Sequence, residues 1–265
     1  MLVLHLLRRH PIPMESVLRR SLVLTYAFPS RLLRDLVGPG LQLLTHKDFG
    51  FLAIAMVETT ALRPKGWPAA LGKSFFLSGY RIFTRLHRPG RATLTGLRIL
   101  RSDTDSRSMA WLSRGLTHYR FHHAYVDVKS DTNKLHIRAR TPNHEADVDV
   151  VAHIANISNI AHPSDASTSP APLPESSPFD SLEEAKRFAG PLPYTFDHEP
   201  ETNSIVVIKG VRKAWSPIQV RVDVREATYL TRAPFVDASP RLASAFYLAN
   251  VPYAWNAGFI EKLAQ

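Results

Sequence analysis

The feature that most constrains the fold is a series of strand-length apolar runs in the first part of the chain. Runs rich in β-branched and aromatic residues predict strands at 21–26, 49–60, 75–86 and 94–102. The sequence HRPGR at 87–91 predicts a turn between the last two, because Pro and Gly supply turn geometry. No run has the length of a membrane-spanning helix. We therefore expect a chain built around β-sheet.

A hairpin can be predicted residue by residue over 134–153. If Asn143 and His144 form a two-residue loop, charges oppose charges on one face and apolar groups oppose each other on the other face. The expected pairs are Arg140–Asp147, Arg138–Asp149, Ile137–Val150 and Ala139–Val148. The period-2 pattern places the charged face in water, where these arginines carry no chemistry.

The remaining organisation is that of one domain with peripheral helices. Residues 29–37 and 180–188 have helical patterns, and Asp180 or Ser181 is expected to cap the second helix. The stretch 162–178 is rich in Pro and Ser and predicts an irregular surface loop. The part after this loop is too small and strand-rich to be independent, so we expect a single domain over 1–265.

Charge is distributed unevenly along the chain, which has a formal net charge of +10. Residues 1–125 hold 19 Lys and Arg against 6 Asp and Glu, whereas the remainder is slightly acidic. This asymmetry indicates an anionic partner for the first half, or simply a solvated basic surface. Nucleic-acid binding is the alternative from another class, although no recognition motif is visible. The absence of cysteine excludes disulfides and favours a reducing, cytoplasmic location.

Two stretches that imitate known sites do not satisfy the requirements of those sites. GWPAALGKS at 66–74 has one residue too many between its glycines for a phosphate-binding loop, and a strand follows it instead of a helix. In HYRFHH, His118 and His122 share a strand face but are about 13 Å apart at strand rise. We therefore expect no metal and no cofactor.

Arginines interrupt two of the predicted core strands. Arg81 lies in GYRIFTRL, and Arg101 follows Leu97 and Ile99 on one face of GLRILRSD. Strands with mixed faces are typical of a barrel or cone with a polar interior. An arginine that points inward needs a partner, and both Asp103 and a ligand carboxylate are candidates. A buried Arg–Asp pair that only stabilises the barrel is the alternative.

These same stretches resemble the YqjF-like family of uncharacterised bacterial proteins. The resemblance is carried by LVLTYAFPSRLLRDLVGPGLQL, FGFLAIAMVETT, FFLSGYRIFTR, GLRILRSDTD and RFAGPLPYTFDHEPETNSIVVIKG. That family is similar in fold to acetoacetate decarboxylase, which implies a cone-shaped, largely antiparallel β-barrel with helices outside and an internal site. The resemblance places Arg19 where the decarboxylase has an active-site arginine.

The catalytic lysine of the decarboxylase has no counterpart here. That enzyme forms a Schiff base on a lysine, whereas this chain has no lysine between Lys73 and Lys129. The two cavity glutamates of the decarboxylase fall near Leu52 and Trp67, which leaves Glu58 as a possible substitute carboxylate. The decarboxylase mechanism is therefore expected to be lost, although the cavity can remain.

Together these observations predict an α+β protein that binds a small anionic or carbonyl-bearing molecule, such as an oxo acid, inside a β-cone. The predicted ligand-binding residues are Arg19, Glu58, Tyr80, Arg81, Arg101 and Asp103. Catalysis is left open; if present, it would be lyase- or hydrolase-like and would not use a Schiff-base lysine. We expect no membrane partner, and a homo-oligomer is possible. Nucleic-acid binding through the basic half is the alternative function.

Overall fold

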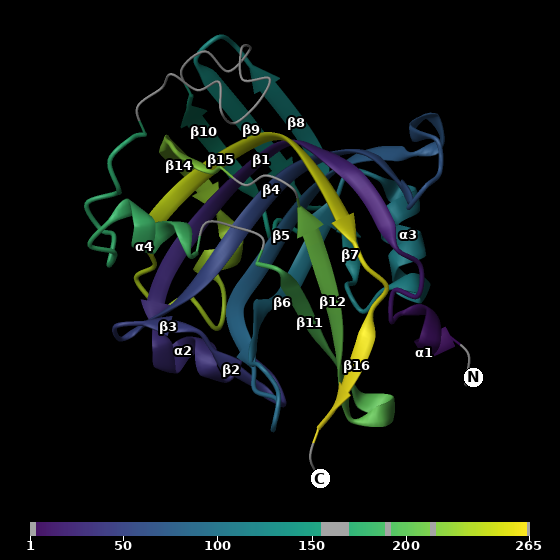
Figure 1. Ribbon diagram of the computed structural model, residues 1–265. Helices are drawn as coiled ribbons and strands as arrows, with labels where there is room; N and C mark the ends of the chain where they lie inside the picture. Colours follow the sequence, from purple (N-terminus) through teal and green to yellow (C-terminus); the bar gives the residue numbers. More distant parts are fainter. Residues whose placement is uncertain (1–3, 155–169, 189–191, 213–215, 264–265) are drawn as a thin grey trace.

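The computed structural model describes residues 4–154, 170–188, 192–212 and 216–263. Strands dominate it, and short helices lie at its periphery (Figure 1). The strands are β1 (Met14–Pro29), β2 (Leu41–Leu43), β3 (Thr45–His46), β4 (Phe49–Pro64), β5 (Lys73–Leu86), β6 (Leu94–Thr104), β7 (Phe121–His123), β8 (Tyr125–Ser130), β9 (Lys134–Arg140), β10 (Val148–His153), β11 (Tyr194–Glu199), β12 (Ser204–Arg212), β13 (Ile218–Gln219), β14 (Arg221–Ala227), β15 (Arg241–Trp255) and β16 (Phe259–Lys262).

The helices are short, and the longest has ten residues. They are α1 (Leu4–Leu7), α2 (Ser30–Arg34), α3 (Arg107–Leu116) and α4 (Leu182–Lys186), together with the 3-10 turns η1 (Ala69–Leu71), η4 (Pro200–Thr202) and η5 (Thr228–Thr231). None of the helices in the described part of the chain combines the length and the apolar character needed to cross a bilayer.

The large sheet closes on itself. Hydrogen-bonded neighbours follow the order β15, β1, β4, β5, β6, β11 and β12, and β12 pairs again with β15 through Gly210–Arg212. All of these pairings are antiparallel except the parallel pairing of β6 with β11. The expectation of a largely antiparallel, cone-like sheet with peripheral helices is therefore confirmed.

A second sheet, in the order β14–β10–β9–β8, packs against one face of the large sheet (Figure 1, top). The residues at this contact include Leu22 and Met56 of the large sheet and Leu135 and Ile137 of β9. The opposite face of the large sheet is covered by the segment around α4, which inserts Phe179 and Phe188. Because both faces of β1 are covered, residues 21–28 are continuously buried, and this explains why they contain no charged residue and are mostly apolar.

The four strands predicted near the N-terminus are all present, and each extends beyond its predicted range. The expected helix at 29–37 is shorter, since it ends at Arg34 with Asp35 as its C-cap. The helix at 182–186 begins as predicted, because the Ser181 hydroxyl accepts a hydrogen bond from the Glu184 amide at 3.2 Å. Of the predicted surface loop, residues 170–178 are irregular, and 162–169 lie outside the described residues.

The hairpin at 134–153 confirms most of its predicted register and corrects its end. Arg138 pairs with Asp149, Ile137 with Val150 and Ala139 with Val148. The ladder stops there, so the predicted Arg140–Asp147 pair and two-residue loop are wrong. Asp147 turns inward instead and accepts hydrogen bonds from the Thr141 amide and hydroxyl at 2.7 and 2.9 Å. A buried carboxylate satisfied by the loop itself replaces a surface ion pair.

Candidate functional site

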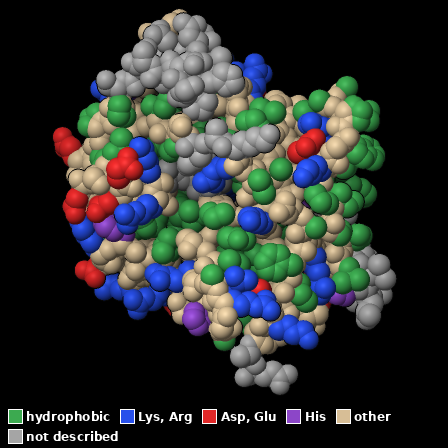
Figure 2. Space-filling model, viewed as in Figure 1, with side chains coloured by type: hydrophobic (Ala, Val, Ile, Leu, Met, Phe, Trp, Pro, Cys, Tyr) green, Lys and Arg blue, Asp and Glu red, His purple; other side chains and the backbone are tan. Residues whose placement is uncertain are grey.

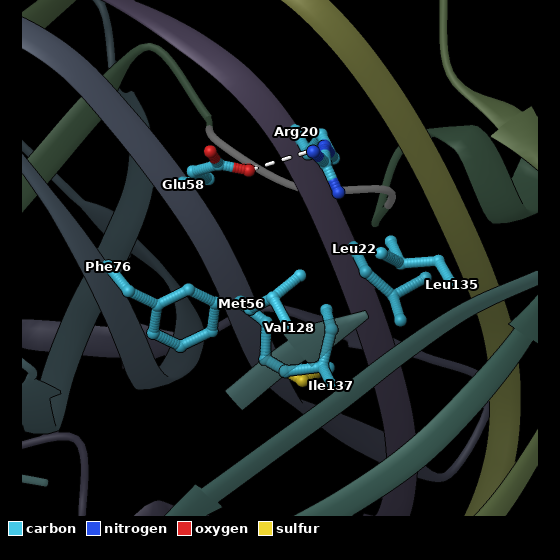
Figure 3. Close-up of a pocket in the computed structure, with 8 residues that line it drawn as sticks. All are labelled: Arg20, Leu22, Met56, Glu58, Phe76, Val128, Leu135 and Ile137. Carbon is cyan, nitrogen blue, oxygen red and sulfur yellow. Dashed lines mark ion pairs between the residues drawn. The ribbon is translucent and has the colours of Figure 1, made fainter. Parts of the chain in front are cut away.

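A small pocket lies between the large sheet and the second sheet (Figure 3). Its cavity volume is about 10 Å³, and the wider hollow around it, which includes open solvent, is about 190 Å³. Most of its lining is apolar, and one acidic and one basic side chain lie at its upper side in the figure. The lining residues are Arg20, Leu22, Met56, Glu58, Phe76, Val128, Leu135 and Ile137.

The charged group at this pocket joins two arginines to one carboxylate. Glu58 Oε1 lies 3.1 Å from Arg19 Nη1, and Glu58 Oε2 lies 3.2 Å from Arg20 Nε. Successive strand residues normally point to opposite faces. Here the β1–β4 register shifts between Leu18 and Arg20, and this irregularity lets both arginines reach the same carboxylate.

The charges in this group do not cancel. Two guanidinium groups face one carboxylate, which leaves a net positive charge beside apolar walls. The side chains of Arg20 and Glu58 are only 23% and 25% exposed, whereas that of Arg19 is 56% exposed. Arg20 also donates to the Ser130 hydroxyl at 3.3 Å, which ties the end of β8 to the pocket. Burial raises the pKa of Tyr247, which lies opposite Leu22 in the sheet, to about 12, so its hydroxyl stays protonated beside this group.

Arg101 and Asp103 form a separate, internally satisfied cluster. Arg101 Nε lies 3.0 and 3.1 Å from the two carboxylate oxygens of Asp103, and Arg101 Nη1 donates to Glu145 at 2.9 Å. The Asp103 side chain has no exposed surface. Burial raises the pKa of Asp103, and the Arg101 guanidinium acts in the opposite direction. The pairing expected from the sequence is present, and the two carboxylates already neutralise the charge of Arg101.

Tyr80 belongs to this same region and is fully buried. Its hydroxyl donates to the Ala146 carbonyl at 3.0 Å, and its ring lies 4.2 Å from the ring of Tyr229. Burial raises the pKa of Tyr80 well above its usual value, so the phenol remains a donor. Tyr80 thus ties the large sheet to the loop after β9.

Arg81 does not join Arg101, which corrects the expectation that both line one cavity. In the β5–β6 ladder Tyr80 pairs with Arg101 and Arg81 pairs with Ile99, with an irregularity between them. Arg81 therefore points to the opposite face from Arg101, and its guanidinium lies over Gly79. Burial lowers the pKa of Arg81, whose electrostatic neighbours are Tyr253 and Tyr119. Its Nε has no hydrogen-bond partner among the described residues.

The three histidines of HYRFHH do not converge. His118 lies 3.8 Å from a carboxylate oxygen of Glu199, whereas His122 lies 3.9 Å from Asp103. His123 contacts the ring of Tyr125. In the described part of the chain no three His, Cys, Asp or Glu side chains are grouped as ligands for a metal ion.

Sequence reasoning selected Arg19 and Glu58 but missed Arg20, the arginine that lines the pocket. The reason is the irregular register of β1, which alternation counting cannot reveal. It also missed Glu145, which comes from the loop of the predicted hairpin and meets Arg101 only after the two sheets pack. The RR pair at 19–20 was the available signal, because Arg19 is the residue left unpaired with β4 at the bulge and Arg20 follows it directly.

The arrangement of strands matches that of several solved structures. An acetoacetate decarboxylase from Legionella pneumophila aligns with a TM-score of 0.59 and 9% identity over 94% of this chain and 87% of that chain. An acetoacetate decarboxylase-like enzyme from Sphingomonas wittichii aligns with a TM-score of 0.55 and 10% identity over 96% and 94% of the two chains. The enduracididine biosynthesis enzyme MppR, complexed with pyruvate, aligns with a TM-score of 0.55 and 9% identity over 94% of this chain and 90% of that chain.

Sequence comparisons place the chain in a family without an assigned activity. The family model DUF2071, described as an uncharacterized conserved protein, matches residues 15–250. A comparison with curated proteins gives no match. At such low identities the structural likeness shows the fold alone, which is the acetoacetate decarboxylase-like fold.

Proposed function

We propose that this chain, which belongs to the DUF2071 family, binds a small organic acid in the pocket beside Arg20 and Glu58. The observation that carries this proposal is the ratio of two guanidinium groups to one carboxylate at an otherwise apolar pocket. An incoming carboxylate would balance the surplus charge. Arginine can bind it through donors that Glu58 does not occupy, because one guanidinium offers five N–H groups.

The pocket favours a short ligand. The cavity volume proper is about 10 Å³, room for roughly one water molecule, so only a short acid could bind, from the open side and with movement of the lining side chains. Leu22, Met56 and Phe76 offer contact to a short hydrocarbon segment. One of the structurally similar proteins is described with pyruvate bound, which supports short oxo acids as the first compounds to test.

Schiff-base chemistry is not part of this proposal. No lysine is among the residues that line the pocket, and neither a serine nor a cysteine nucleophile is among them. The two arginines can hold and orient an acid, and the Glu58 carboxylate lies within reach of an acid bound there. Borohydride treatment with acetoacetate or pyruvate should therefore leave no stoichiometric adduct, as measured by intact mass. A mass increase that maps to a lysine would contradict this expectation.

Binding can be tested with pyruvate, acetoacetate and a short acyl carboxylate by titration calorimetry and ligand-observed NMR. Arg20→Met should weaken binding of these acids by at least about tenfold, since a charge-assisted hydrogen bond contributes roughly 1.5–3 kcal/mol. Arg138→Met is the matched control, because Arg138 pairs with Asp149 on β9 and does not line the pocket. Equal loss in both variants, or unchanged binding in Arg20→Met, would exclude this pocket.

A further inference from the structure

An exposed apolar face lies on one side of the molecule, and none of its residues lines the pocket. Seven of the eleven large hydrophobic residues exposed in the described part of the chain belong to three segments, residues 4–13, 65–73 and 107–116. They are Leu6, Leu7, Ile12, Trp67, Leu71, Trp111 and Leu112. Trp111 is 70% exposed, Leu71 is 65% exposed and Trp67 is 56% exposed, so they are among the most exposed side chains of this set.

Contacts between the three segments make this face continuous. The Lys65 amide bonds to the Pro13 carbonyl at 2.9 Å, next to Ile12. Lys73 Nζ donates to the Ser108 hydroxyl at 3.0 Å, one helical turn before Trp111 and Leu112. Helix α1 packs against α3. Figure 2 shows hydrophobic side chains gathered along the right edge of the molecule, where Figure 1 places α3 and the loop between β4 and β5.

Basic side chains predominate around this apolar face, and the exposed Asp105 directly before α3 is an acidic exception. The stretches 1–13, 60–75 and 106–118 contain seven Lys and Arg and no Asp or Glu. Of the carboxylates that approach, Glu15 pairs with Arg63 at 2.8 Å and Glu199 pairs with Arg9, whereas Asp105 accepts a hydrogen bond from the Phe76 amide at 2.8 Å. Lys65, Lys73 and Arg107 remain exposed. A second copy of this chain would bring like charges together, which disfavours a symmetric dimer through this face.

We propose that this face, defined as residues 4–13, 65–73 and 107–116, docks peripherally on a bilayer that contains anionic phospholipids. Tryptophans at the level of the headgroups, aliphatic side chains below them and flanking lysines and arginines are the elements of interfacial binding. Five of the seven apolar side chains are aliphatic and cannot stack on bases, so a nucleic acid would leave them without a partner. The sequence alone indicated no membrane partner, because the three segments become one surface only after folding.

The test uses the full chain with vesicles of phosphatidylglycerol and phosphatidylcholine, compared with pure phosphatidylcholine, in a sedimentation assay. We expect binding to the anionic vesicles that weakens with salt, and quenching of tryptophan fluorescence by brominated lipid. The double variant Trp67→Ser/Trp111→Ser should bind at least about tenfold more weakly. Its control is Val236→Ser, which removes a side chain that is 58% exposed outside this face and should not change binding.

A charge variant tests the electrostatic part independently. Loss of one basic residue near an anionic membrane costs roughly fivefold in affinity. Lys65→Glu/Arg107→Glu reverses two charges and should lose at least this much per residue. Arg221→Glu/Arg225→Glu, at exposed positions on β14, should lose much less. Circular dichroism and melting curves establish that the variants fold. Equal binding to neutral vesicles, or no binding to anionic vesicles at low salt, overturns the proposal. So does a wild-type dimer that Trp67→Ser/Trp111→Ser dissociates without any vesicle binding, or binding to duplex DNA alone.

Discussion

At the scale of single residues, Arg101 shows how a charged group can belong to the core of a β-sheet. Its guanidinium contacts Asp103 and Glu145, and the Asp103 side chain is completely buried. Removal of one partner from such a pair leaves an uncompensated buried charge. The free-energy cost of that charge exceeds the net stabilisation that the intact pair provides. The sequence predicted the Arg101–Asp103 pair because the two residues share a strand face; Glu145 could not be predicted because it comes from another sheet.

Arg101→Met should therefore reduce the free energy of unfolding by about 3–5 kcal/mol, measured by urea denaturation. Burial already raises the pKa of Asp103, and loss of the cation would raise it further. A carboxyl whose pKa is higher in the folded than in the unfolded state makes folding more favourable as the pH falls. The variant should thus regain stability between neutral and mildly acidic pH. Arg138→Met, at a side chain that is 42% exposed, should cost less than about 1 kcal/mol. A variant of Arg101 as stable as the wild type would contradict this account.

At the scale of elements, alternation patterns determined strand pairing well and strand ends poorly. The register of β9 with β10 follows from matching charges and apolar groups, and the structure reproduces it from Lys134 to Ala139. The pattern cannot show where a ladder stops. Asp147 stops it, because its carboxylate is 2% exposed and bonds to Thr141 and His144 within the loop. A loop whose polar groups bond to one another is therefore an alternative to extending the β9–β10 pairing by one more residue pair.

Asp147→Ala should destabilise the protein by roughly 1–3 kcal/mol, since the Thr141 amide loses its acceptor in a buried position. Although burial acts to raise it, hydrogen bonds from His144 and Thr141 lower the pKa of Asp147 below its usual value. The stability that ionised Asp147 contributes is fully present above the pKa that this carboxyl has in the unfolded state, and it is lost as the pH falls through the lower pKa of the folded state. The variant should therefore show a flatter acid-unfolding curve below about pH 4. Arg140→Ala should be close to neutral. If Arg140→Ala cost as much as Asp147→Ala in thermal unfolding, the surface pairing predicted from the sequence would be the correct one.

At the scale of the whole molecule, the sequence indicated a cone from mixed-face strands and from its resemblance to decarboxylase-like proteins. It did not show how the ring closes or which face each arginine takes. A single irregularity beside Tyr80 places Arg81 and Arg101 on opposite faces, and another beside Leu18 brings two arginines to Glu58. Such irregularities shift the side-chain phase by one residue. Their positions depend on pairing with a neighbouring strand and not on the local sequence alone.

The ring closes where β12 meets β15, and Gly210 is the residue that permits this approach. A Cβ at Gly210 would lie 1.9 Å from the Tyr253 hydroxyl, and Tyr253 is buried against Trp255. Gly210→Ala should therefore cost about 1–3 kcal/mol, as overpacking does in a core. Hydrogen exchange should accelerate in β12 and in the C-terminal end of β15, because their pairing holds the ring together.

Two further variants make this last prediction specific to closure. Gly115→Ala adds the same methyl group in α3, where nothing lies within 4 Å, and should not destabilise the protein. Tyr253→Phe removes the hydroxyl that the new Cβ would meet, so Gly210→Ala/Tyr253→Phe should be more stable than the sum of the two single changes predicts. Additive effects, or exchange that accelerates equally in the second sheet, would mean that the β12–β15 contact does not hold the ring closed. Positive coupling between the two changes, together with hydrogen exchange that accelerates only in β12 and β15, would identify this contact as the place where the ring closes.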